Sequence, residues 1–209
     1  MNCILAIDLS TPRGHIAVAK AGQVIYEQDF TSHRSHNSML YGPLSIALEA
    51  AGKDLNKIAI GTGPGSYTGV RISIAAAHGV ALSRGLQVVG LPSLTAVSQL
   101  PEFLVVGDAR RGKYYAGRIS DRKLKDGLLL LEESELRIWR QQNSALDCFT
   151  TDPVVPLELP AVVIAQPSAA LLALHAGDEC PEPGVEIEPI YVQDAFLTKA
   201  KTPTMGTQV

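Results

Sequence analysis

The spacing of apolar residues changes along the first hundred residues, and this order constrains the fold more than any other feature. Three strand-like segments come first, at 2–9, 14–20 and 23–30. Helix-like and strand-like segments then alternate, at 40–51, 57–61, 70–84, 87–91 and 93–100. Three antiparallel strands followed by alternating helix and strand predict a ribonuclease-H-like lobe, in which helices pack on a five-stranded mixed sheet.

The second half of the chain shows a weaker version of the same order. Strand-like segments at 103–109, 113–120 and 128–132 are followed by a helix-like segment at 134–142, an apolar segment at 161–165 and a second helix-like segment at 167–176. We therefore expect an α/β protein with two lobes. Residues 1–98 would form the first lobe and residues 99–209 a smaller, degenerate second lobe. Whether the last twenty residues pack back on the first lobe stays open.

Composition places the chain among globular proteins, since 46% of its residues are hydrophobic and 19% are charged. No apolar run approaches the roughly 20 residues of a membrane span, and the N-terminus lacks the pattern of a signal peptide. The three cysteines, Cys3, Cys148 and Cys180, are odd in number and far apart, which argues against a disulfide framework or a cysteine zinc site. We expect a cytoplasmic protein that does not bind membranes.

Charge is distributed unevenly along the chain. The net charge of −3 argues against a dedicated nucleic-acid-binding protein. Residues 110–125 nevertheless carry seven basic residues against Asp121 alone, and Arg110, Arg111 and Lys113 begin this block. The block could meet an anion or a phosphate backbone. A solvated strand and turn is the alternative, and the acidic stretch after residue 125 would repel nucleic acid.

The segment Asp8-Leu9-Ser10-Thr11 ends the first predicted strand. In sugar kinases, actin and the heat-shock chaperones, an acidic residue at this place helps to hold a metal–nucleotide, and a Gly-Thr turn offers backbone amides to phosphate. Here Ser10 stands where the glycine would be, and its Cβ atom hinders close approach of a phosphate. Asp and Ser after a strand also form ordinary turns, so the segment by itself does not establish nucleotide binding.

A glycine-rich segment, residues 61–69, joins a predicted strand to a predicted helix. It lacks the lysine of a Walker A loop, because no lysine occurs between Lys57 and Lys113. It also lacks the glycine spacing of a dinucleotide-binding fingerprint. We therefore favour a tight crossover at which backbones pass closely.

Small residues recur at every fourth position from the start of the helix at 70–84, namely Gly69, Ser73 and Ala77. Such a stripe allows close approach of another helix. This helix and the one at 40–51 both carry more apolar surface than contact with one sheet requires. The surplus indicates either a partner protein or cover by the second lobe, and both readings stay open.

The spacing of the histidines does not indicate a metal-binding site. His33 and His36 lie in a polar loop without nearby carboxylates or cysteines, and His78 is expected to be a packed helix residue. No Ser/His/Asp set or nucleophile motif can be assigned from spacing.

The stretch from Gly61 to Ile72 resembles the signature of the bacterial TsaB (YeaZ) family. Its residues in this chain include Gly61, Gly63, Pro64, Gly65, Ser66, Tyr67, Thr68 and Arg71. The Asp8–Thr11 turn, Leu91–Leu94, and Asp108–Arg110 before Tyr114 are also similar to the family. The resemblance is strong over residues 1–120 and weaker beyond, where Pro189–Val192 carries it.

The resemblance implies a two-lobed fold of the actin, hexokinase and heat-shock class. It also implies a non-catalytic subunit that partners TsaD and, with TsaE and the enzyme TsaC, serves the formation of N6-threonylcarbamoyladenosine beside the anticodon of tRNA. Nucleotide and metal would sit on TsaD, and none in this chain, whose histidines lack the His-x-x-x-His spacing of the TsaD metal motif. Alone, the chain would form a homodimer, and it would contact tRNA only through the complex.

In the family, the two helices that flank the glycine-rich loop form a helical bundle with the partner. That implies an interface here at Leu40, Leu44, Leu48, Gly69, Val70, Ser73, Ala76, Ala77 and Val80. Arg110, Arg111 and Lys113 are candidates for a tRNA contact within the complex. Two alternatives remain: a small-molecule kinase or peptidase of the same fold with its own activity, and a stand-alone tRNA-binding protein, which the 5% aromatic content does not favour.

Overall fold

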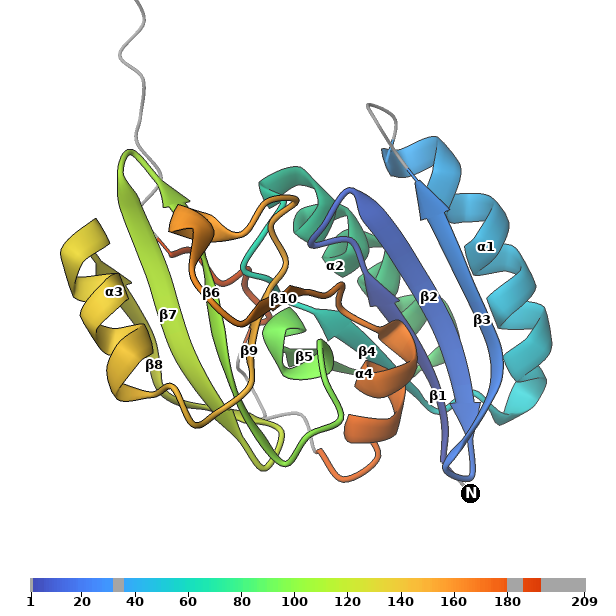
Figure 1. Cartoon of the computed structure of the whole chain (residues 1–209). Coiled ribbons are helices and arrows are strands. Elements are labelled where there is room, and N and C mark those ends of the chain that lie inside the picture. Colours follow the sequence, from blue (N-terminus) through green and yellow to red (C-terminus); the bar gives the residue numbers. More distant parts are fainter. Residues whose placement is uncertain (1, 32–35, 180–185, 193–209) are drawn as a thin grey trace, which may run out of the picture.

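The computed structural model describes residues 2–31, 36–179 and 186–192, and its strands form two five-stranded sheets (Figure 1). The first sheet has the order β3-β2-β1-β4-β5. Its strands are β1 (Cys3–Asp8), β2 (Arg13–Lys20), β3 (Gln23–Thr31), β4 (Lys57–Gly61) and β5 (Gln87–Leu91). The first three strands pair antiparallel, whereas β4 and β5 are parallel to β1. This mixed sheet confirms the ribonuclease-H-like order predicted from the periodicity.

Two long helices cover one face of the first sheet. They are α1 (His36–Ala51) and α2 (Tyr67–Arg84). Side chains alternate along β1, so that Leu5 and Ile7 pack under these helices while Ile4 and Ala6 belong to the core on the other face. The predicted helix at 93–100 is shorter in the structure, where only a 3₁₀ turn, Ser93–Ala96, is formed.

The second sheet repeats the topology of the first, with the order β10-β9-β6-β7-β8. Its strands are β6 (Glu102–Arg110), β7 (Lys113–Ser120), β8 (Lys123–Leu131), β9 (Cys148–Thr150) and β10 (Val162–Ile164). Helix α3 (Glu133–Gln142) covers the face away from the first lobe, as Figure 1 shows. The predicted repeat of pattern is therefore confirmed. Two 3₁₀ turns, Gly52–Asp54 and Pro156–Glu158, complete the elements of the described part.

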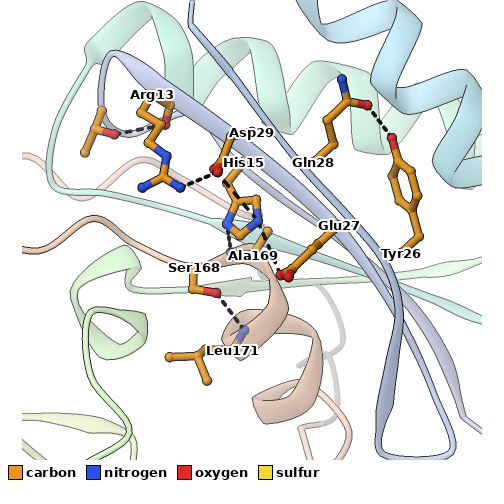
Figure 2. A network of polar contacts seen from close by, with 10 residues as sticks. Arg13, His15, Tyr26, Glu27, Gln28, Asp29, Ser168, Ala169 and Leu171 are labelled. Carbon is orange, nitrogen blue, oxygen red and sulfur yellow. Dashed lines mark hydrogen bonds and ion pairs between the residues drawn. The ribbon is translucent and has the colours of Figure 1, made fainter.

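The last helix corrects the predicted boundary between the lobes. Helix α4 (Ala169–His175) packs on the face of the first sheet opposite α2, beside Ala6 and Ala17. Figure 2 shows how its start is held: His15 Nδ1, on β2, accepts a hydrogen bond of 3.0 Å from the Ala169 amide. Since α4 buries its apolar side on the first sheet, it belongs to the first lobe by packing, although the prediction placed it in the second.

The end of α4 and the segment 186–192 are also fastened to the first lobe. Lys57 Nζ, on β4, donates to the carbonyl oxygens of Ala176 at 2.8 Å and Glu179 at 2.6 Å. The Ile190 amide donates to the Thr62 carbonyl at 2.8 Å. As far as the structure describes it, the C-terminal stretch thus packs back on the first lobe. Residues 193–209 lie outside the described part.

Two further predictions concern the cysteines and the membrane. Cys3 and Cys148 are buried free thiols, and Cys180 lies outside the described residues. Among the helices that the structure describes, none is both long and apolar enough to cross a membrane.

Candidate functional site

The Asp8–Thr11 turn is held by hydrogen bonds between its own residues and their neighbours in the chain. Asp8 is buried at the end of β1, and its Oδ1 accepts hydrogen bonds from the Ser10 amide at 2.8 Å and the Ser10 hydroxyl at 2.6 Å. Burial raises the pKa of the Asp8 carboxyl above its ordinary value, although the Ser10 and Ser93 hydroxyls oppose the shift. Ser10 therefore binds Asp8. It does not leave the turn open for a phosphate, as a glycine at this position would.

The glycine-rich loop packs directly on this turn. The Ser66 amide donates to the Ser10 carbonyl at 2.6 Å. A Cβ atom at Gly65 would overlap that same carbonyl, and one at Gly69 would overlap the Leu9 carbonyl. These two glycines are therefore needed for a close approach of backbones. The prediction of a tight crossover is confirmed.

The rest of the signature positions the start of α2. Ser66 is the N-cap residue, since its hydroxyl accepts from the Gly69 amide at 3.1 Å. Gly63 donates its amide to Ser93 Oγ at 2.9 Å, and Pro64 is buried beside it. Tyr67 and Thr68 are exposed on the first turn of the helix. The loop thus packs over the Asp8 turn, and α2 begins directly after it.

An apolar groove of about 590 Å³ lies between α1 and α2. Its lining consists of Leu40, Tyr41, Leu44, Tyr67, Thr68, Arg71, Ile72, Ala75, Ala76, Gly79 and Val80. Leu40 and Leu44 form its floor and belong to the core, whereas Ala75 and Gly79 are exposed along α2. A continuous apolar hollow between two helices has the shape that receives a third helix.

The structure divides the predicted interface residues into two groups. Leu40, Leu44, Ala76 and Val80 line the groove. Gly69, Val70, Ser73 and Ala77 do not, because they are buried against the first sheet. The predicted small-residue stripe therefore faces inward, and its role as an interface is corrected. Leu48 is partly buried and lines a second hollow farther along α1.

Sequence reasoning missed two aromatic residues of the groove region. Tyr41 lies between Leu40 and Leu44 on α1 and is exposed at the groove, so the helical spacing of that segment could have indicated it. Tyr191 comes from the other end of the chain. Its ring lies 5.5 Å from the ring of Tyr67, centroid to centroid. No local pattern in the sequence relates residue 191 to α2.

The basic block at 110–125 is largely neutralised by neighbouring carboxylates. Its ion pairs are Arg110 with Asp108, Lys113 with Glu132, Arg118 with Glu102, Arg122 with Asp178, and Lys123 with Glu179. Arg110, Arg111 and Lys113 lie at the β6–β7 turn. Because these pairs lower the positive potential of the block, a tRNA contact here stays a prediction.

The histidines do not gather with other metal-binding side chains in the described residues, where no group of three or more His, Cys, Asp or Glu is placed to hold a metal ion. His78 is exposed on α2, contrary to the expectation that it would be packed. His33 lies outside the described residues, and only the backbone of His36 is described.

Comparison with known proteins finds similarity to proteins named for tRNA modification. The family model "TsaD: tRNA N6-adenosine threonylcarbamoyltransferase" matches residues 25–127. The tRNA threonylcarbamoyladenosine biosynthesis protein TsaB of Buchnera aphidicola is 33% identical over 126 residues, which cover 56% of this chain. TsaB of Escherichia coli is 34% identical over 122 residues, which cover 54% of this chain. The chain is thus similar to TsaB (YeaZ) proteins over part of its length. The matched regions span 60% of the Buchnera TsaB and 52% of the E. coli TsaB, less than two thirds of either protein.

Solved structures of similar fold support the two-lobed architecture of this chain. An uncharacterized protein with similarity to peptidase YEAZ from Pseudomonas aeruginosa aligns with a TM-score of 0.69 at 23% identity, covering 92% of this chain and 100% of that one. YeaZ from P. aeruginosa aligns with a TM-score of 0.63 at 24% identity, covering 85% and 91% of the two chains. At these identities the likeness establishes the fold.

Proposed function

We propose that this chain is a non-catalytic subunit in the formation of N6-threonylcarbamoyladenosine in tRNA, and that it binds TsaD and holds it in an active shape. The open apolar groove between α1 and α2 carries this proposal, because it is a helix-sized hollow lined by apolar residues beside the glycine-rich signature. The TsaB relatives, which are named for this biosynthesis, support the same role. Residues that would contact TsaD are Leu40, Tyr41, Leu44, Ala75, Ala76 and Val80.

The chemistry would reside on the partner. Asp8 Oδ1 accepts hydrogen bonds from the Ser10 amide and hydroxyl, and the glycine-rich loop covers the turn at which related folds hold phosphate. We therefore assign nucleotide and metal to TsaD, and no cofactor to this chain. An independent kinase or peptidase activity is the alternative, and no arrangement among the described residues favours it.

Assembly would follow from the same groove. In the absence of TsaD, two copies would cover their apolar surfaces mutually and form a homodimer. With TsaD, the heterodimer would replace the homodimer, TsaE would join, and tRNA would be reached only through the complex.

Light scattering after size-exclusion chromatography tests the proposal. We expect the chain mixed with TsaD from the same cell to elute as a complex with the mass of a defined assembly, at the expense of the homodimer. Adding TsaE and nucleotide should preserve that complex. Failure to form any complex under all of these conditions would overturn the proposal, and nucleotide-dependent chemistry of the isolated chain would support the alternative.

A further inference from the structure

The two helices that form the groove carry almost no negative charge. Helix α2 contains Arg71 and Arg84 and no acidic residue, and α1 contains Glu49 alone. Glu49 lines the second hollow and not the groove. Among the described residues that line the groove, Arg71 is consequently the one with a charged side chain.

Arg71 is held in place by two tyrosines at the rim of the groove. Its guanidinium carbon lies 4.4 Å from the centroid of the Tyr67 ring, in a cation–π contact. Its Nε and Nη2 donate to the Tyr191 hydroxyl at 3.2 Å and 3.0 Å. Both tyrosines also contact each other, with ring centroids 5.5 Å apart. The three side chains therefore form a cluster that restricts the rotamers of Arg71 before any partner binds.

Tyr191 reaches this cluster because its own segment is anchored. The preceding residue, Ile190, donates its amide to the Thr62 carbonyl at 2.8 Å. The following residue, Val192, packs with the core between the lobes, next to Leu94 and Phe103. Tyr191 is thus a positioning residue, since it acts on the groove through Arg71.

The charge of Arg71 is not neutralised within the described residues. Its hydrogen bonds go to the Tyr191 hydroxyl, and Glu188 acts on it only at longer range than an ion pair. A positioned arginine at the edge of an apolar hollow is complementary to a carboxylate that an incoming helix carries at its margin.

We propose that the groove receives a helix of TsaD that carries an aspartate or glutamate, and that this carboxylate pairs with Arg71 as positioned by Tyr67 and Tyr191. The inference rests on the proposed function and specifies the chemistry of the partner. A second copy of this chain fits the groove less well. Its α1 and α2 carry two arginines, Arg71 and Arg84, and only one acidic residue, Glu49, which lies outside the groove. Charge complementarity thus favours TsaD over self-association.

Binding of TsaD to four variants tests the inference. Arg71→Gln removes the charge, Arg71→Lys keeps the charge without the planar guanidinium, and Tyr191→Phe keeps the ring without the hydroxyl. Arg84→Gln, on the same helix but outside the groove, is the matched control. The dissociation constant is measured by titration calorimetry at low and high salt, and thermal unfolding of each variant confirms that it is folded.

We expect Arg71→Gln to weaken TsaD binding on the order of 10- to 100-fold and to flatten its salt dependence. Tyr191→Phe should weaken it by about 3-fold, since one hydrogen bond is lost, and Arg71→Lys should retain part of the affinity. Homodimerisation of Arg71→Gln should be unchanged or stronger, because a like charge is removed.

Equal affinities for Arg71→Gln and Arg84→Gln would overturn the inference, as would a loss of homodimer that matches the loss of the TsaD complex. A separate variant, Ala76→Glu, distinguishes this outcome from failure of the proposed function. If Ala76→Glu abolishes TsaD binding while Arg71→Gln does not, the groove binds TsaD without the carboxylate. If neither variant weakens binding, TsaD binds outside the groove, whereas failure of the unsubstituted chain to bind TsaD at all would overturn the proposed function itself.

Discussion

His15 Nδ1 accepts a hydrogen bond of 3.0 Å from the Ala169 amide, and this bond joins β2 to the start of α4 across 154 positions of sequence. Because Nδ1 accepts, the ring proton lies on Nε2, which faces the carboxylates of Glu27 at 3.8 Å and Asp29 at 4.0 Å. The imidazole therefore links the edge of the first sheet to the helix that closes its open face.

Replacing His15 should loosen α4. His15→Leu leaves the buried Ala169 amide without an acceptor, and we expect a loss of about 1–3 kcal/mol in the free energy of unfolding. Chemical denaturation measures the loss, and hydrogen exchange should show faster exchange in α4 than in α2. If the amide exchange rates of α4 in the variant equal those in the unsubstituted chain, the role assigned to His15 is contradicted.

Two glycines of α2 should respond oppositely to the same change. Gly69→Ala places a Cβ atom on the Leu9 carbonyl, so we expect a destabilisation of about 1–3 kcal/mol or more. Gly79→Ala meets no atom within 4 Å and improves helix propensity, so we expect a stabilisation of about 0.5–1 kcal/mol. Thermal unfolding of both variants checks the pair. An unchanged stability of Gly69→Ala would show that the start of α2 is not in close backbone contact with the Asp8 turn.

The buried Asp8 carboxyl should give a pH dependence with a defined sign. Burial raises its pKa in the folded state, so the folded state holds the proton more tightly than the unfolded chain, whose carboxyl has a pKa of about 3.9. The contribution of Asp8 to stability is then fully present below that value and is lost as the pH rises through the raised folded pKa.

Asp8→Asn removes this titration while keeping an oxygen that can accept from Ser10. The difference in unfolding free energy, unsubstituted chain minus variant, should therefore fall as the pH rises from about 4 toward neutrality. Denaturant titrations at a series of pH values measure it. A difference that grows with pH over this range would mean that the folded environment favours the ionised form.

The periodicity of the first hundred residues was sufficient to predict the first sheet, because β1 to β5 are either alternating or continuously apolar. Strand β9 was not predicted, since its three residues, Cys148–Thr150, form neither a continuous apolar run nor an alternation long enough to show a period. The position of α4 was also not predictable. Its attachment depends on His15 and Lys57, which are distant in sequence and carry no signal of that contact.

The candidate site was only partly predictable, for a physical reason that α2 illustrates. Both sides of this helix are rich in small and apolar residues, so the sequence does not say which side faces the sheet. The stripe of Ser73 and Ala77 faces inward, whereas Ala75 and Ala76 lie toward the groove. The cluster of Arg71 with Tyr191 depends on tertiary structure alone.

The central claim is that TsaD binds in the groove between α1 and α2. The most direct measurement compares TsaD binding by Ala76→Glu with binding by Leu82→Glu, two substitutions of an apolar residue by glutamate on the same helix. Ala76 lines the groove, whereas Leu82 is 89% exposed outside it. We predict that Ala76→Glu abolishes the complex in light scattering while Leu82→Glu retains it, with both variants folded. Retention of the complex by Ala76→Glu, or its loss in both variants alike, would contradict the claim.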